Sequence, residues 1–136
     1  MRIKQVSVFV ENESGRLEAI LEALERANIS IRALSVSDTA EFGIVRMILD
    51  NPDEGLNTLR QAGFTTRVDW MLSAQIPDVP GGLLNSVAKP MAKAGINIKY
   101  FYASIGQVGE NKAMVVFKPD DIEKAEKVLK SLSVGS

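Results

Sequence analysis

The sequence carries the same ordered set of landmarks twice, and this repeat limits the possible folds more than any other feature. The paired landmarks are Gly15 and Gly81, Leu17 and Leu83, Ala27-Asn28-Ile29 and Ala94-Gly95-Ile96, and Pro52 and Pro119. The first two pairs are 66 residues apart, and the other two are 67 residues apart. Four landmarks in one order, with a slip of a single residue, indicate internal duplication. We therefore expect two similar units, residues 1–70 and 71–136.

The hydrophobic pattern of the first unit alternates between strand and helix periods. Val6, Val8 and Val10 recur at period two, which is typical of a strand. Apolar residues then recur at helical spacing from Leu17 to Leu24, with charged residues mostly on the opposite face. The rest of the unit predicts a strand from Ile29, a strand over residues 42–49, a helix that starts near Pro52 and ends at Gly63, and a strand over residues 65–76.

The second unit repeats this order, but it has no room for a last strand before Ser136. Its predicted elements are a helix from Leu83 to Met91, a strand through Tyr102, a strand over residues 113–117 and a helix after Pro119. Pro90 lies inside the first of these helices, where it is expected to kink the helix or start a new turn. The run over residues 65–76 must finish the first unit and begin the second. The predicted fold is α+β, with antiparallel sheets that carry their helices on one face.

Two absences from the composition exclude several kinds of chemistry. The chain has neither cysteine nor histidine, which excludes disulfides, thiol catalysis and zinc sites built from these side chains. The side chain best suited to proton transfer near pH 7 is also missing. Catalysis by carboxylates or lysine stays open, but we expect a protein that is not an enzyme and that uses no cofactor and no metal.

Charge and hydropathy limit the kinds of partner that the chain is expected to bind. The 16 basic and 17 acidic residues give a net charge of −1, without the basic surplus that phosphate binding favours. The apolar runs have the length of strands, far below the ~20 residues that span a bilayer. The first residues lack the basic-then-apolar pattern of a signal peptide. These features predict a cytoplasmic protein that binds neither nucleic acid nor a membrane.

The strand–loop–helix junction, which occurs twice, is the most informative segment for function. Gly15 and Gly81 allow a ligand to approach the backbone closely and tolerate dihedral angles that are closed to other residues. The helix that follows presents free N–H groups and the positive end of its dipole, which suit a carboxylate. Asn12 and Asp78, at the loop entrances, can hold an ammonium group, although both residue types are also common helix caps. Together these groups suit a zwitterion.

Both junctions resemble the signature loop of the ACT domain family. The segments that carry the resemblance are Val10-Glu11-Asn12-Glu13-Ser14-Gly15-Arg16-Leu17, Ile76-Pro77-Asp78-Val79-Pro80-Gly81-Gly82-Leu83, and the later Ala27-Asn28-Ile29-Ser30-Ile31 and Gly95-Ile96-Asn97-Ile98. The resemblance covers almost the whole chain as a tandem pair. It implies ferredoxin-like βαββαβ units, the second without its own last strand. It also implies amino-acid binding at interfaces between paired domains and regulation of amino-acid metabolism.

The resemblance further implies which residues contact the ligand. They are Asn12, Glu13, Ser14, Gly15, Arg16, Leu17, Asn28 and Ile29 in the first unit, and Asp78, Val79, Pro80, Gly81, Gly82, Leu83, Ile96, Asn97 and Ile98 in the second. The ligand is expected to contact a loop of one unit and a strand start of the neighbouring unit. A homodimer and an enzyme partner in amino-acid metabolism are further expectations.

Other functions stay open at the level of sequence. The run Glu11-Asn12-Glu13-Ser14-Gly15 also resembles the loop of the small regulatory subunit of acetolactate synthase, which senses a branched-chain amino acid. A module that serves only for dimerisation would bind no amino acid. Tyr100 and Tyr102 share one face of a predicted strand, as in domains that stack RNA bases, but the basic and glycine-rich context of such a motif is absent.

Overall fold

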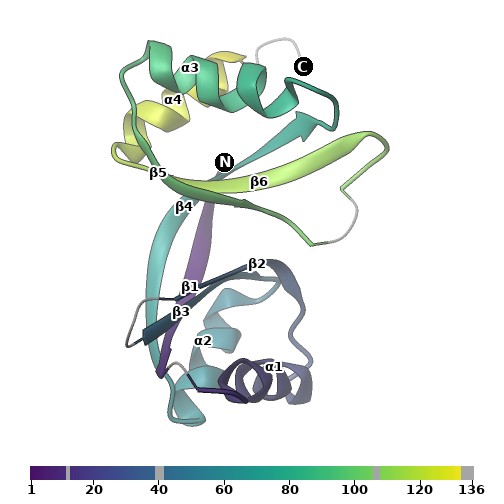
Figure 1. The fold of residues 1–136 in the computed structure, drawn as a ribbon, viewed down its shortest axis with the longest axis vertical. Helices are drawn as coiled ribbons and strands as arrows, with labels where there is room; N and C mark the ends of the chain where they lie inside the picture. The colour runs from purple at the N-terminus through teal and green to yellow at the C-terminus, as the bar shows by residue number, and fades with distance from the viewer. Residues whose placement is uncertain (12, 39–41, 106–107, 133–136) are drawn as a thin grey trace. The chain divides into compact units, whose positions relative to one another are not determined.

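A computed structural model describes the 136-residue chain except for residues 12, 39–41, 106–107 and 133–136. Its elements follow in the order β1 (Arg2–Glu11), α1 (Arg16–Arg26), β2 (Ile31–Asp38), β3 (Phe42–Leu49), α2 (Pro52–Gln61), β4 (Thr65–Pro77), the π-helix η1 (Leu84–Ala88), α3 (Lys89–Lys93), β5 (Ile98–Ala103), β6 (Lys112–Pro119) and α4 (Ile122–Leu132). The strand order is β2-β3-β1-β4-β6-β5, with antiparallel registers within each unit (Figure 1). This is the α+β fold that the sequence predicts. None of the described helices is long and apolar enough to cross a membrane.

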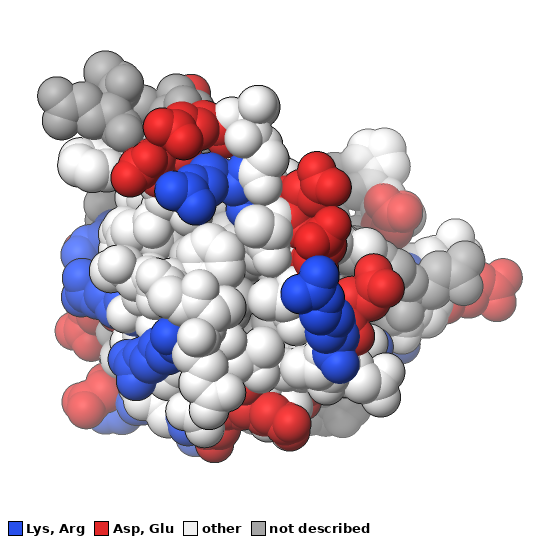
Figure 2. All heavy atoms as spheres, turned by 90° about the horizontal axis from the view of Figure 1, so that it is seen from below, with Lys and Arg blue, Asp and Glu red and all other residues white. Residues whose placement is uncertain are grey.

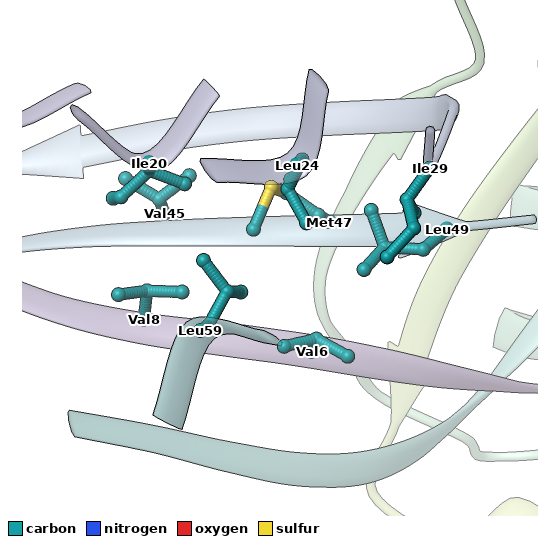
Figure 3. Close-up of a cluster of buried hydrophobic side chains, with 9 residues drawn as sticks. All are labelled: Val6, Val8, Ile20, Leu24, Ile29, Val45, Met47, Leu49 and Leu59. Carbon is teal, nitrogen blue, oxygen red and sulfur yellow. The ribbon is translucent and has the colours of Figure 1, made fainter. Parts of the chain in front are cut away.

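The first unit, Lys4–Asp69, builds its core between one face of its strands and the helices α1 and α2. Period two turns Val6 and Val8 of β1 toward the helices, where they stand opposite Met47 and Val45 of β3. The complete set of buried core residues is Val6, Val8, Ile20, Leu24, Ile29, Val45, Met47, Leu49 and Leu59 (Figure 3). One apolar face on each element therefore suffices to fix this half of the fold.

Local sequence sets the ends of both helices in this unit. Asn28 follows α1 with φ 58° and Gly63 follows α2 with φ 90°, both in the left-handed region that ends helices. At the start of α2, the Glu54 N–H donates to Asn51 Oδ1 at 3.2 Å, while Asn51 Nδ2 donates to Glu54 Oε2 at 3.0 Å. This reciprocal cap, followed by Pro52 in the first turn, explains why α2 begins where it does.

The second unit comprises Met1–Ile3 and Trp70–Ser136, and the structure describes it as far as residue 132. Its buried core residues are Leu72, Ile76, Val87, Met91, Ile96, Val115, Phe117 and Ala125. The helix after its first strand changes from π to α at Lys89, one residue before Pro90. Because proline lacks an N–H and its ring crowds the carbonyl four residues earlier, the wider π turn accommodates it.

The first three residues of the chain lie in the second unit, although the repeat assigns them by sequence to the first. The Ser73 N–H donates to the Met1 carbonyl at 2.8 Å, and the Met1 ammonium donates to the Ser73 carbonyl at 3.1 Å. Arg2 Nε also lies 3.2 Å from Glu126 Oε1 of α4. Desolvation lowers the pKa of the Met1 ammonium. The start of β1 therefore supplies part of the strand that the second copy lacks.

Candidate functional site

The first strand–helix loop joins β1 to α1 and contains a left-handed glycine. Gly15 has φ 88°, a conformation that residues with a Cβ rarely adopt. Among the described residues, no atom beyond its chain neighbours lies within 4 Å of the position that a Cβ would take. Within the loop, the Glu13 N–H donates to the Glu11 carbonyl at 2.8 Å, and Arg16 Nη2 lies 3.6 Å from Glu11 Oε2. Asn12 lies outside the described residues.

The start of α1 offers backbone donors beside this glycine. Aligned peptide dipoles place positive partial charge at the first turn of this 11-residue helix. Gly15 supplies no side-chain cap, and within the described part of the chain the N–H groups of Leu17 and Glu18 have no hydrogen-bond partner. Among the described residues, these two N–H groups are free and lie next to open space, so they form a cradle that suits a carboxylate.

The second strand–helix loop joins β4 to η1 and is tighter. Gly81 has φ 80°, and a Cβ on it would lie 3.1 Å from a neighbouring side-chain nitrogen. A Cβ on Gly82 would overlap the carbonyl oxygen of Pro77, so the close approach of the backbone requires glycine. The Asp78 N–H donates to the Asn111 carbonyl at 2.8 Å. Among the described residues, this loop is therefore packed more closely than the first, and the carbonyl of Asn111, just before β6, anchors its entrance.

Exposure divides the predicted ligand-contact residues into groups. The exposed ones are Glu13, Ser14, Gly15, Leu17, Asn28, Asp78, Val79, Pro80, Gly81 and Asn97, while Arg16, Leu83 and Ile98 are half-buried and Ile29, Gly82 and Ile96 are buried. The side chains of Ile29 and Ile96 belong to the two hydrophobic cores. These two residues hold the strand starts in place with their side chains turned away from solvent.

An aspartate also forms hydrogen bonds at the start of β2 and of β5. The sequence patterns did not predict either aspartate. In the first unit, the Ser30 N–H donates to Asp50 Oδ1 at 3.1 Å, and the Asp50 N–H donates to the Ser30 carbonyl at 3.0 Å. Asn97 and Asp120 make the same pair of bonds in the second unit, at 3.2 and 2.9 Å. Both aspartates directly follow a strand and precede a helix, a repeated signal that could have revealed them.

The loop and the strand start of one unit lie at opposite ends of its first helix. The first loop precedes Arg16, whereas Asn28 and Ile29 follow Arg26, and a helix of this length extends ~16 Å. A pocket of about 320 Å³ at the far end of α1 is lined by Leu21, Leu24, Glu25 and residues 28–31. A ligand the size of an amino acid cannot bridge both ends within one unit.

The face of the molecule that is seen from below carries side chains of both charges. Figure 2 shows acidic side chains next to basic ones over the visible face, with uncharged surface between them. On that face no single sign dominates, so it lacks the stripe of positive charge that polyanions require.

Comparison with known families identifies the class of protein that these two units form. A family model described as "ACT domain pair" matches residues 1–134. The fold and the two loops thus define a tandem module of a regulatory type. The chain belongs to the ACT domain family, a regulatory, amino-acid-binding family with ferredoxin-like units. A comparison with curated protein sequences found no match.

Solved structures share this architecture. Protein BT0572 from Bacteroides thetaiotaomicron is 34% identical, with a TM-score of 0.88, and the match covers 96% of this chain and 88% of that chain. The regulatory subunit of aspartate kinase from Thermus thermophilus is 16% identical, with a TM-score of 0.67 and coverages of 95% and 89%. The same subunit from Thermus flavus is also 16% identical, with a TM-score of 0.63 and coverages of 94% and 88%. The two aspartate kinase subunits are similar to this chain in fold.

Proposed function

We propose that this ACT pair is a sensor that binds a free amino acid in its strand–helix loops, at an interface between units or subunits. Membership of a regulatory, amino-acid-binding family supports this function. The observation that carries the proposal is the first loop, where Gly15 lies next to two free N–H groups of α1. The α-carboxylate of the ligand accepts hydrogen bonds from these groups.

Charged side chains at the loops complete the recognition of a zwitterion. Glu13 and Asp78 are exposed at the two loops and attract the ligand's ammonium group. Arg16 pairs with Glu11 only at 3.6 Å, and the two side chains are 43% and 65% exposed. Such a pair contributes little stability, so Arg16 is free to exchange partners with a ligand carboxylate.

Regulation requires that another protein respond to the ligand-bound state of this chain. The regulatory subunits of aspartate kinase that share this fold are named as parts of an enzyme. We extend this arrangement to the present chain as a homodimer in the cytoplasm that controls an enzyme of amino-acid metabolism. The chain itself then carries no catalytic residue.

A thermal-shift screen of the twenty amino acids tests the proposed function. At least one is expected to stabilise the protein, by about 2.7 kcal/mol at a concentration 100-fold above its Kd. The N-acetylated and amidated forms of that amino acid serve as controls, because each lacks one of the two charges. Both controls are expected to lose the shift. A screen in which no amino acid raises the midpoint would instead indicate a module that serves only for dimerisation.

A further inference from the structure

Two consecutive polar residues lie between a strand and the next helix in each unit, and they bond to different partners. The pairs are Asp50-Asn51 after β3 and Asp120-Asp121 after β6. The second residue of each pair caps the helix, because its side-chain oxygen accepts an N–H of the first turn at 3.2 and 3.1 Å. The carboxylate of the first residue instead accepts from the start of β2 or of β5.

The carboxylate of Asp50 takes the place of a backbone acceptor in the first unit. Ile31 of β2 stands opposite Leu49 of β3, so Ser30 and Asp50 form the next pair outward. The Asp50 N–H donates to the Ser30 carbonyl, as in a regular antiparallel pair. The Ser30 N–H, however, donates to Asp50 Oδ1. A side-chain oxygen thus completes the pair at the point where the backbone leaves the sheet to enter α2.

The second unit repeats this geometry around a different residue. Asp120 forms the same two bonds with Asn97, which stands where the first unit has Ser30. A left-handed residue precedes each strand start: Asn28 has φ 58° and Gly95 has φ 73°. Because only the backbone of the bound residue takes part, its side chain can differ between the units while the aspartate is the same. The repeated feature is therefore the conformation of the strand start.

In the first unit the strand start borders the pocket of about 320 Å³ at the end of α1. Ser30 is exposed and is among the residues that line this pocket. Asp50 is not among the described residues that line it. The carboxylate therefore acts on the pocket through the Ser30 backbone, whose N–H it holds.

We propose that Asp50 and Asp120 are positioning residues of the amino-acid site, and that each holds the backbone of a strand start in the orientation that contacts the ligand. This role rests on the proposed function, with a strand start as the second side of the site. A peptide group that is fixed before the ligand arrives loses less conformational freedom on binding, which favours affinity. The role needs an oxygen acceptor and no charge, so asparagine can fill it.

Titration calorimetry on variants of the full chain tests this role with the amino acid found in the screen. At least one of Asp50→Ala and Asp120→Ala is expected to weaken binding about five-fold, which corresponds to the net loss of one hydrogen bond. The matching asparagine variant is expected to bind as the unaltered chain does. Asn51→Ala and Asp121→Ala are the controls, because each removes an exposed side-chain bond one residue away without touching a strand start.

Urea unfolding of the same variants separates affinity from stability. The cap variants are expected to lose about as much stability as the aspartate variants, yet to keep their affinity. Unchanged affinity in both aspartate-to-alanine variants, or an equal loss in the caps, would overturn the role alone. A loss in the asparagine variant as large as in the alanine variant would assign the carboxylate charge to the ligand and overturn it too. An unaltered chain that binds no amino acid would instead overturn the proposed function, and this role with it.

Discussion

Replacing Gly15 by alanine is expected to weaken amino-acid binding at the first loop at least ten-fold while the fold persists. Gly15 has φ 88°, and an alanine there costs ~1–2 kcal/mol in its left-handed conformation. The strain is relieved by turning the peptide units of the loop, which moves the N–H groups of Leu17 and Glu18 away from a carboxylate. Titration calorimetry with the amino acid found in the screen measures the loss.

Gly63→Ala is the matched control for this prediction. Gly63 has φ 90°, and for both glycines no described atom beyond the chain neighbours lies within 4 Å of a Cβ position. The two alanine variants should therefore lose similar stability, while only Gly15→Ala loses affinity. Equal affinity in the two variants would show that the first loop does not hold the ligand.

The largest loss of stability is expected from Phe117→Ala in the core of the second unit. Phe117 is fully buried on β6, next to Leu72 of β4. Truncation removes its apolar surface from the core and leaves a cavity, which costs ~3–5 kcal/mol. Urea unfolding followed by the fluorescence of Trp70, the single tryptophan, gives the free energy of unfolding.

Phe101→Ala provides the comparison within the same strand pair. Phe101 stands directly opposite Phe117 in the β5–β6 register, but it is 50% exposed. The same change of side chain is therefore expected to cost about 1 kcal/mol or less. If the two variants lost equal stability, the packing described for this core would be wrong.

Much of the fold follows from local patterns in the sequence. β3 covers residues 42–49 as predicted, because an apolar run is bounded by turn residues on both sides. The helix predicted from Pro52 begins there, since a cap and a proline act locally. The prediction that Tyr100 and Tyr102 share a face agrees with their register opposite Lys118 and Val116. The hydroxyl of Tyr100 lies 3.7 Å from Met71 Sδ, so this tyrosine packs within the unit.

Features that depend on contacts between residues far apart in the sequence could not be predicted from local patterns. Nothing near Met1 in the sequence indicates that it pairs with Ser73, because the choice of partner strand depends on tertiary packing. Leu17 matches the inward stripe of α1, yet it is 36% exposed, because it lies in the first turn next to the open loop. The loop residues were recognised from the repeated motif, whereas the two aspartates at the strand starts needed the register of neighbouring elements.

A titration followed by NMR of backbone amides tests the central claim most directly. Addition of the amino acid found in the screen is expected to shift the amide signals of Leu17 and Glu18, or those of Leu83 and Leu84 at the second loop, more than any others. The N–H groups of Leu17 and Glu18 are those proposed to bind the carboxylate at the first loop, and Leu83 and Leu84 hold the matching positions after Gly81 at the second loop. The largest shifts elsewhere in the chain, with both helix starts unchanged, would contradict this claim.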